Sequence, residues 1–120
     1  MKTQEVTQKI QDFIKGGDNS DLELLENTLH KNYRNVQSGF FDKKGLFNFP
    51  KEKYKSLIQE RTFGGVPRTM EIIQLDIMEN IAYAQVKLES SALKFRYLIV
   101  LVKDADKWWV IGNYPSIKQL

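Results

Sequence analysis

The sequence has no cysteine and a single histidine in 120 residues. Without cysteine the chain has no disulfide framework and no thiolate that could act as a nucleophile or a metal ligand. His30 has no second histidine with which to share a metal ion, so we expect no metal site. No serine nucleophile motif is present either. Phosphate-binding loops and dinucleotide fingerprints are also absent, and we therefore predict no cofactor.

Long apolar runs are also missing. Nothing approaches the roughly 18 to 20 apolar residues that a transmembrane helix needs. The N-terminal stretch MKTQEVTQKIQDF lacks the apolar segment of a signal peptide. We therefore expect no membrane partner and a cytoplasmic location, which the absence of cysteine fits. Hydrophobic residues at 42% and charged residues at 28% are typical of a globular domain.

The net charge of +3 is concentrated in the middle of the chain. Residues 42–68 carry seven basic and three acidic side chains, with Phe47, Phe49 and Tyr54 among them. Basic residues interleaved with aromatic ones can bind single-stranded nucleic acid. However, the lysines between residues 51 and 55 fit the solvated side of a helix, and no RNA-binding motif is present. We therefore expect no nucleic-acid partner.

Two helices are predicted at the start of the chain. The first is expected to end at Gly16–Gly17, and its apolar stripe comprises Val6, Ile10, Phe13 and Ile14. The second is expected over residues 18–30, capped by Ser20 or Asp18, and its stripe comprises Leu22, Leu25 and Leu29. A third helix is predicted to begin at Pro50 and to extend toward Phe63.

Strands are predicted for most of the remaining chain. One or two short strands are expected around a turn at residues 42–45, and a four-stranded antiparallel meander is expected over 68–79, 81–90, 93–103 and 107–117. In the first strand of the meander, alternation predicts Ile73, Leu75 and Ile77 on one face and Asp76 on the other. The last two strands are apolar on both faces, and each face is expected to receive one of the two adjacent tryptophans.

Helices that precede the strands along the chain predict a single α+β domain over residues 1–120, with the helices on one face of a curved, mainly antiparallel sheet. Three stretches resemble the nuclear transport factor 2-like (NTF2-like) superfamily, and within it the branch called putative lumazine-binding or SnoaL-like. They are FIKGGDNSDLELLENTLHKNY, LDIMENIAYAQVKLE and FRYLIVLVKDADKWWVIGNY. The resemblance implies a cystatin-like α+β cone.

One residue departs from the pattern of this branch. Relatives often carry an aspartate just before the tyrosine of the penultimate strand, whereas Arg96 precedes Tyr97 here. The resemblance therefore does not imply the acidic pocket of those relatives. An anionic ligand, or an ion pair between Arg96 and Asp76, is expected instead.

The resemblance also suggests what covers the second face of the sheet. In the superfamily one face curls around the helices, and the other often packs against the sheet of a second copy. Leaving several large apolar side chains exposed would be a liability, so we expect a homodimer through this face. The alternative is a monomer in which loops or the C-terminal tail cover it.

His30 and Asp76 are the candidate catalytic residues. His30 is the one side chain of a type whose ordinary pKa lies near 7. The alternative is that it is a residue at the C-terminal end of a helix, where its charge interacts favourably with the helix dipole. A carboxylate in mid-strand, such as Asp76, is costly unless it is paired. Relatives such as ketosteroid isomerase use aspartates that project into the cone. The alternative for Asp76 is an outward position, paired with Lys87 or Arg96.

A mixed aromatic and polar set is predicted to line a small-molecule pocket; core packing explains most of its aromatic members equally well. The set comprises Tyr33, Arg34, Tyr54, Arg96, Tyr97, Trp108 and Asn113. We predict a non-catalytic domain that binds a small hydrophobic or anionic ligand. One alternative is a small SnoaL-like or ketosteroid-isomerase-like enzyme (a cyclase, isomerase or dehydratase) that uses His30 and Asp76. Another is a purely structural dimerisation module.

Overall fold

A computed structural model of the chain describes residues 2–40 and 43–119. The described residues form three helices and six strands. In chain order these are α1 (Lys2–Asp18), α2 (Leu22–Thr28), β1 (Leu29–Phe40), β2 (Lys43–Pro50), α3 (Lys51–Gln59), β3 (Thr69–Met78), β4 (Ile81–Glu89), β5 (Leu93–Asp104) and β6 (Lys107–Gln119). No helix in the described part of the chain is long and apolar enough to cross a membrane.

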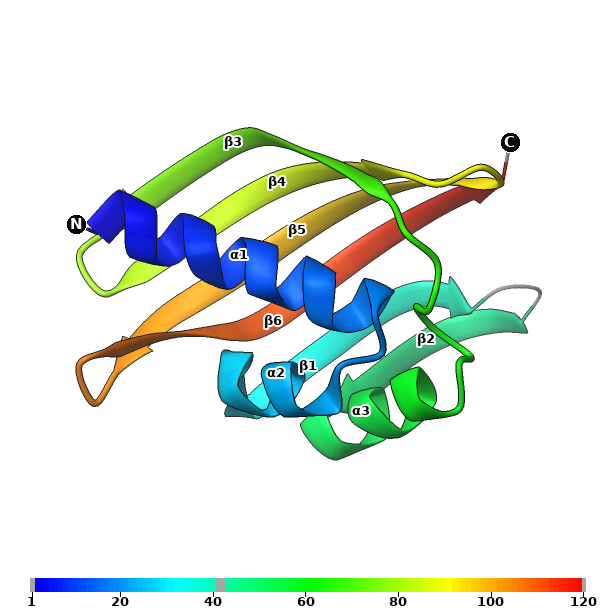
Figure 1. Ribbon diagram of the computed structural model, residues 1–120, viewed down its shortest axis with the longest axis horizontal. Coiled ribbons are helices and arrows are strands. Elements are labelled where there is room, and N and C mark those ends of the chain that lie inside the picture. Colours follow the sequence, from blue (N-terminus) through cyan, green and yellow to red (C-terminus); the bar gives the residue numbers. More distant parts are fainter. Residues whose placement is uncertain (1, 41–42, 120) are drawn as a thin grey trace.

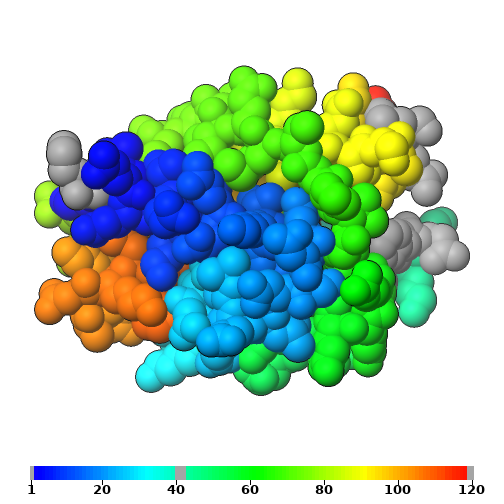
Figure 2. Space-filling view, viewed as in Figure 1, coloured from blue at the N-terminus to red at the C-terminus, as the bar shows by residue number. Residues whose placement is uncertain are grey.

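The six strands form one mixed sheet in the order β2-β1-β6-β5-β4-β3. Neighbouring strands are antiparallel, except that β1 and β6 run parallel. All three helices lie on one face of this sheet (Figure 1), and in the space-filling view they cover that face (Figure 2). The α+β architecture predicted from the sequence is therefore confirmed. We call the face under the helices the inner face and the opposite one the outer face.

The core lies between α1 and the inner face. The predicted stripe of α1 is buried as expected, with Val6 and Ile10 fully inaccessible. From the sheet, every second side chain of β4 and β5 reaches the same core; these are Ala82, Ala84, Val86 and Leu88 on β4, with Ile99 and Leu101 on β5. Burial of a large apolar side chain contributes about 1.5–3 kcal/mol, so this alternation fixes which face of each strand turns inward.

The boundaries of the first two helices differ from the prediction. α1 continues through Gly16 and Gly17 to Asp18. The N-cap of α2 is Asp21, whose carboxylate accepts a hydrogen bond from the Leu24 amide at 3.1 Å. Neither Ser20 nor Asp18 is the cap, because Ser20 takes a left-handed conformation (φ 50°) in the connection and the Asp18 carboxylate binds Arg68.

α2 also ends earlier than predicted, at Thr28, and Leu29 begins β1. Tertiary contacts explain this end. Leu29 pairs with Val110 on β6, and the buried Lys51 ammonium donates to the carbonyl oxygens of Glu26 (3.1 Å) and Leu29 (2.9 Å). A lysine from α3 thus satisfies carbonyls that the end of α2 leaves free. The strands that follow, β1 and β2, are longer than predicted; their connecting turn lies partly outside the described residues.

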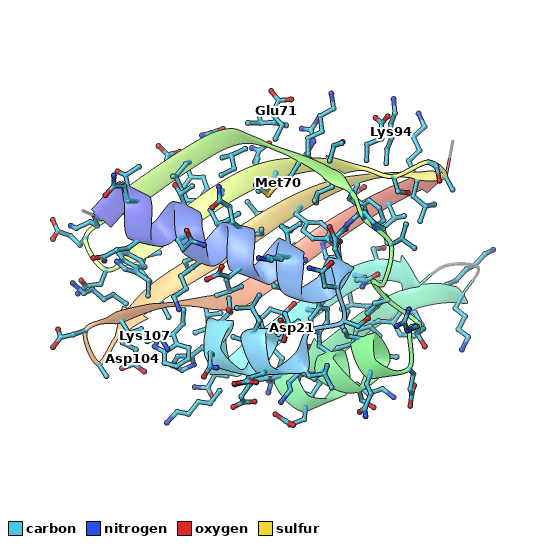
Figure 3. The ribbon with its side chains drawn as sticks, in the orientation of Figure 1. Asp21, Met70, Glu71, Lys94, Asp104 and Lys107 are labelled. Atoms are coloured by element: carbon cyan, nitrogen blue, oxygen red, sulfur yellow. The ribbon has the colours of Figure 1, made fainter. Side chains whose placement is uncertain are left out.

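A bulge in β3 changes the side-chain alternation that the sequence predicts. Ile72 pairs with Val86, but the next pair is Gln74 with Gln85, so Ile73 is an extra residue. The core-facing side chains are therefore Met70, Ile72, Leu75 and Ile77, and the predicted grouping of Ile73 with Leu75 was wrong. Met70 lies within the molecule and Glu71 projects away from it (Figure 3).

A second bulge occurs in β6. Leu101 pairs with Val110 and Val100 with Gly112, which leaves Ile111 without an opposite residue. Trp108 and Val110 precede the bulge and face the core, and Asn113 follows it and is buried too. Trp109 lies half-buried on the outer face, so the prediction of one tryptophan for each face is confirmed.

The loop between α3 and β3 is fastened to the end of α1. The Gly65 amide donates to the Gly17 carbonyl at 3.1 Å. Gly64 has φ +69°, and a Cβ built on it would overlap the same carbonyl oxygen. Gly65 has a similar φ of +76°, but a Cβ there would make only ordinary contacts.

We therefore expect Gly64→Ala to destabilise the protein far more than Gly65→Ala. Both substitutions force alanine into a left-handed conformation, which costs about 1–2 kcal/mol. Gly64→Ala adds a steric overlap with backbone, of about 1–3 kcal/mol by analogy with overpacking. Urea unfolding of the two variants measures the difference, and equal midpoints would contradict the close contact at Gly64.

Candidate functional site

The inward side chains of β1 form a row of hydrogen-bonded polar groups. Tyr33, Asn35 and Gln37 alternate along the strand, and each is at most 4% exposed. The Gln37 Nε2 group donates to Asn35 Oδ1 at 3.0 Å, and Asn35 Nδ2 donates to the Tyr33 hydroxyl at 3.1 Å. The period-2 alternation of a strand puts all three on one face. This row forms one wall of a polar region inside the core.

Three tyrosines surround Phe13 next to this row. The ring centroids of Tyr33, Tyr54 and Tyr97 lie 6.0, 5.9 and 6.2 Å from that of Phe13, and those of Tyr33 and Tyr54 are 5.3 Å apart. They come from β1, α3 and β5, so packing of the helices on the sheet brings them together. Burial raises the pKa of Tyr33 and of Tyr54 well above that of an ordinary phenol. Both therefore stay neutral hydroxyl groups and cannot serve as bases near pH 7.

Arg68 links this cluster to the end of α1. Its Nε donates to Asp18 Oδ1 at 2.7 Å and its Nη1 to the Tyr97 hydroxyl at 2.9 Å. Its guanidinium carbon lies 4.7 Å from the ring centre of Phe95 and 5.3 Å from that of Tyr97, in cation–π range. The side chains of Arg68 and Asp18 are 8% and 10% exposed. Burial raises the pKa of Asp18 and Arg68 opposes that rise, so the carboxylate depends on the guanidinium to remain charged.

Arg68 is also the point where the interior approaches the surface. A groove of about 380 Å³ is lined by Arg68 with Pro67 and Thr69 on one side and Glu89, Ser90 and Ser91 on the other.

The polar cluster is hereafter defined as Asp18, Tyr33, Asn35, Gln37, Tyr54, Arg68, Tyr97 and Asn113. It combines one buried ion pair, three phenols and three carboxamides.

Asn113 is the one carboxamide of the cluster without a partner among the described residues. It is fully buried, and neither Oδ1 nor Nδ2 has a hydrogen-bond partner among the described residues. Leaving a buried donor or acceptor unpaired costs about 1–3 kcal/mol for each group. Burial of the Asn113 side chain therefore lowers the stability of the fold.

The structure divides the predicted pocket residues. Tyr33, Tyr54, Tyr97 and Asn113 belong to the polar cluster, and Trp108 is buried in the apolar core. Arg34 and Arg96 are exposed, because they alternate with inward neighbours. Arg96 pairs in register with Lys87 and Ser116 on the outer face, far along the strand from Asp76, so the expected Arg96–Asp76 ion pair does not form.

Four members of the cluster were missed from the sequence. Asn35 and Gln37 follow Tyr33 at period 2, and a strand prediction for residues 29–40 would have identified them. Asp18 and Arg68 lie in a helix end and a loop 50 residues apart, and no sequence pattern joins them. Arg68 supplies the buried positive charge that Arg96 was expected to supply.

His30 is held outside the cluster. Its Nε2 lies 2.8 Å from Asp104 Oδ2, and its Nδ1 accepts a hydrogen bond from the Asn32 amide at 3.0 Å. Its ring packs edge-on against Trp109 of the outer face. Asp104 and Lys107 pair across the β5–β6 turn, where both are labelled in Figure 3. His30 therefore connects β1 to this turn, and both of its ring nitrogens are engaged.

Asp76 lies on the outer face, opposite Tyr83. Gln74 Nε2 donates to its carboxylate at 2.8 Å, and this hydrogen bond together with one from Tyr83 lowers its pKa. His30 and Asp76 therefore do not face a common interior ligand, which was the requirement for acid/base catalysis by this pair. Among the described residues no group of three or more histidine, aspartate or glutamate side chains is placed to hold a metal ion.

Comparison with known families adds to this geometry. The model of the family described as "Putative lumazine-binding" matches residues 1–114 of the chain. No curated protein matches the chain in sequence.

Solved structures with the same fold are numerous. An NTF2-like protein of unknown function from Silicibacter pomeroyi has a TM-score of 0.83 at 11% identity, with 97% of this chain and 95% of that chain covered. One from Shewanella baltica has a TM-score of 0.83 at 18% identity, covering 98% and 94%. A ketosteroid isomerase-like protein from Erwinia carotovora atroseptica has a TM-score of 0.76 at 12% identity, covering 94% and 93%. At these identities the likeness shows the NTF2-like fold.

The Arg68–Asp18 pair gives a testable consequence. Arg68→Met keeps apolar contact with Phe95 but leaves Asp18 buried without its partner, and removing one member of a buried pair costs about 3–5 kcal/mol. We expect a loss of this order in urea unfolding. The double variant Asp18→Asn with Arg68→Met should recover much of it, and Arg61→Met in the same loop should change stability by less than about 0.5 kcal/mol. A stable Arg68→Met variant would contradict a structural role for the pair.

Proposed function

The chain belongs to the family described as "Putative lumazine-binding", and on this basis we propose that it is a non-catalytic small-molecule-binding domain. The proposed pocket lies between the helices and the inner face of the sheet, at the polar cluster. The observation that carries the proposal is the chemistry of that cluster. Eight polar or ionisable side chains from helices, a loop and three strands converge beside the apolar side chains of the core.

Packing alone does not account for this composition. Buried polar groups cost free energy unless they are bonded, and a closed cone needs only apolar side chains. Ligand pockets, in contrast, combine aromatic walls with a few placed polar groups. Neutral tyrosines and carboxamides suit a flat, largely apolar molecule, and Arg68 offers a positive charge to an anionic substituent.

The catalytic alternative has less support. A SnoaL-like or ketosteroid-isomerase-like enzyme needs an acid and a base beside the same ligand, whereas His30 and Asp76 both lie outside the cluster. The ketosteroid isomerase-like neighbour shares 12% identity, which bears on fold and not on activity. Binding without catalysis is therefore the function that the geometry supports best.

The proposal is tested with a panel of flat aromatic compounds that includes lumazine, using thermal shift and calorimetric titration. We expect at least one compound to bind the wild-type protein. Tyr33→Phe should weaken that binding by about 3- to 10-fold, the value of one hydrogen bond. Tyr83→Phe removes the same hydroxyl on the outer face and is the matched control. Binding that Tyr83→Phe alters and Tyr33→Phe does not, or no binding at all, would argue against the pocket.

We further propose that the protein is a homodimer through the outer face. Five large apolar side chains of this face are 39–59% exposed: Ile73, Met78, Ile81, Leu98 and Tyr114. They lie on four adjacent strands, β3 to β6, so they form a broad patch rather than scattered residues. A second copy presents the same apolar surface, and a two-fold interface is self-complementary.

Light scattering coupled to gel filtration tests this assembly. We expect the wild-type protein at twice its chain mass of 14.0 kDa, and we expect Leu98→Lys to shift it to 14.0 kDa. Leu46→Lys is the control, because Leu46 is 75% exposed on β2, away from the patch. A wild-type monomer would contradict the dimer and leave the binding proposal intact.

A further inference from the structure

The unpaired carboxamide of Asn113 lies on the inner face because of the bulge in β6. The bulge at Ile111 is what turns Asn113 inward, where it pairs in register with Ile99 on β5 and Asn35 on β1. A regular β6 would place Asn113 on the outer face, with Gly112 inside. Bulges of this kind re-aim particular side chains, often beside functional sites.

The neighbours of Asn113 do not satisfy it. Asn35, which lies beside it on β1, accepts from Gln37 and donates to Tyr33. Ile99, on the other side, is apolar. Among the described residues, both the Oδ1 acceptor and the Nδ2 donor of Asn113 are therefore uncommitted, although buried amides are nearly always bonded.

We infer that Asn113 recognises the ligand, and that this ligand carries a cis-amide edge, meaning an N–H beside a C=O in a ring lactam or imide. A carboxamide offers an acceptor oxygen and a donor NH₂ group side by side in one plane. A lactam edge offers their complement and satisfies both atoms at once. A carboxylate has acceptors alone and would leave Oδ1 unpaired. This inference rests on the binding function proposed above and specifies the chemistry of the ligand.

If Asn113 binds a ligand, two results are expected that would not be expected of an amide with a purely structural role. Without ligand, the unpaired amide destabilises the protein, so Asn113→Leu should raise the melting temperature by about 3–8 °C. The same variant should lose its preference for lactams. Asn48→Leu makes the same change at an exposed position on β2 and should alter neither property.

The probes are 2-quinolone and coumarin, which differ in that a ring N–H of the first is a ring oxygen in the second. We expect the wild-type protein and Asn48→Leu to bind 2-quinolone at least about tenfold more tightly than coumarin, since a site built to bond a donor rejects an analogue that lacks it. Asn113→Leu should bind the two with similar affinity.

Three results would overturn the inference. The first is a wild-type protein that binds both probes equally, or that binds other members of the aromatic panel but not 2-quinolone. The second is an Asn113→Leu variant that keeps the lactam preference. The third is an Asn113→Leu variant that melts below the wild type, which would make the amide structural. In each case binding of panel compounds that Tyr33→Phe weakens would still support the pocket, whereas a complete absence of binding would defeat both proposals.

Discussion

A strand presents only every second side chain to a core, and two bulges decide which side chains of β3 and β6 reach the interior. The extra residues Ile73 and Ile111 each shift the alternation of their strand. The first bulge keeps Leu75 and Ile77 in the core and Asp76 on the outer face. The second brings Asn113 inside. The polar and apolar groups that these two strands present to the interior depend on the two extra residues, because each reverses the alternation of the side chains that follow it.

Inside the cone, a single guanidinium adds polar bonds between the end of α1 and β5, which already pack together. Arg68 binds the last residue of α1 and the hydroxyl of a tyrosine on β5, and its guanidinium carbon lies within cation–π range of two aromatic rings. Its backbone follows the glycine loop that is bonded to the end of α1. The helix end, the loop and the sheet are therefore fixed together at the place where the polar cluster approaches the surface groove.

The two faces of the sheet differ in what they offer to partners. The inner face carries hydrogen-bonding groups that are already buried and positioned, which would lower the entropy cost of the small-molecule binding proposed above. The outer face carries the patch of exposed apolar side chains together with the hydrogen-bonded group of Gln74, Asp76 and Tyr83. A rim of His30, Asp104 and Trp109 ties β1 to the β5–β6 turn at its edge. Substitutions on opposite faces therefore test the proposed binding and the proposed dimer separately.

The sequence by itself determined the class of the fold, the three helices, the long strands of the second half and the assignment of one tryptophan to each face. Those features follow from hydrophobic periodicity over many residues. Each apolar side chain that such a segment buries favours the same structure, and these contributions add. It also pointed to Tyr33, Tyr54, Tyr97 and Asn113 through their chemical type. It could not place Asp76 or pair Asp18 with Arg68, and it misplaced the start of β1. Only the tertiary structure decided these, because a bulge depends on the partner strand, an ion pair on two distant segments, and the end of α2 on a lysine from another helix.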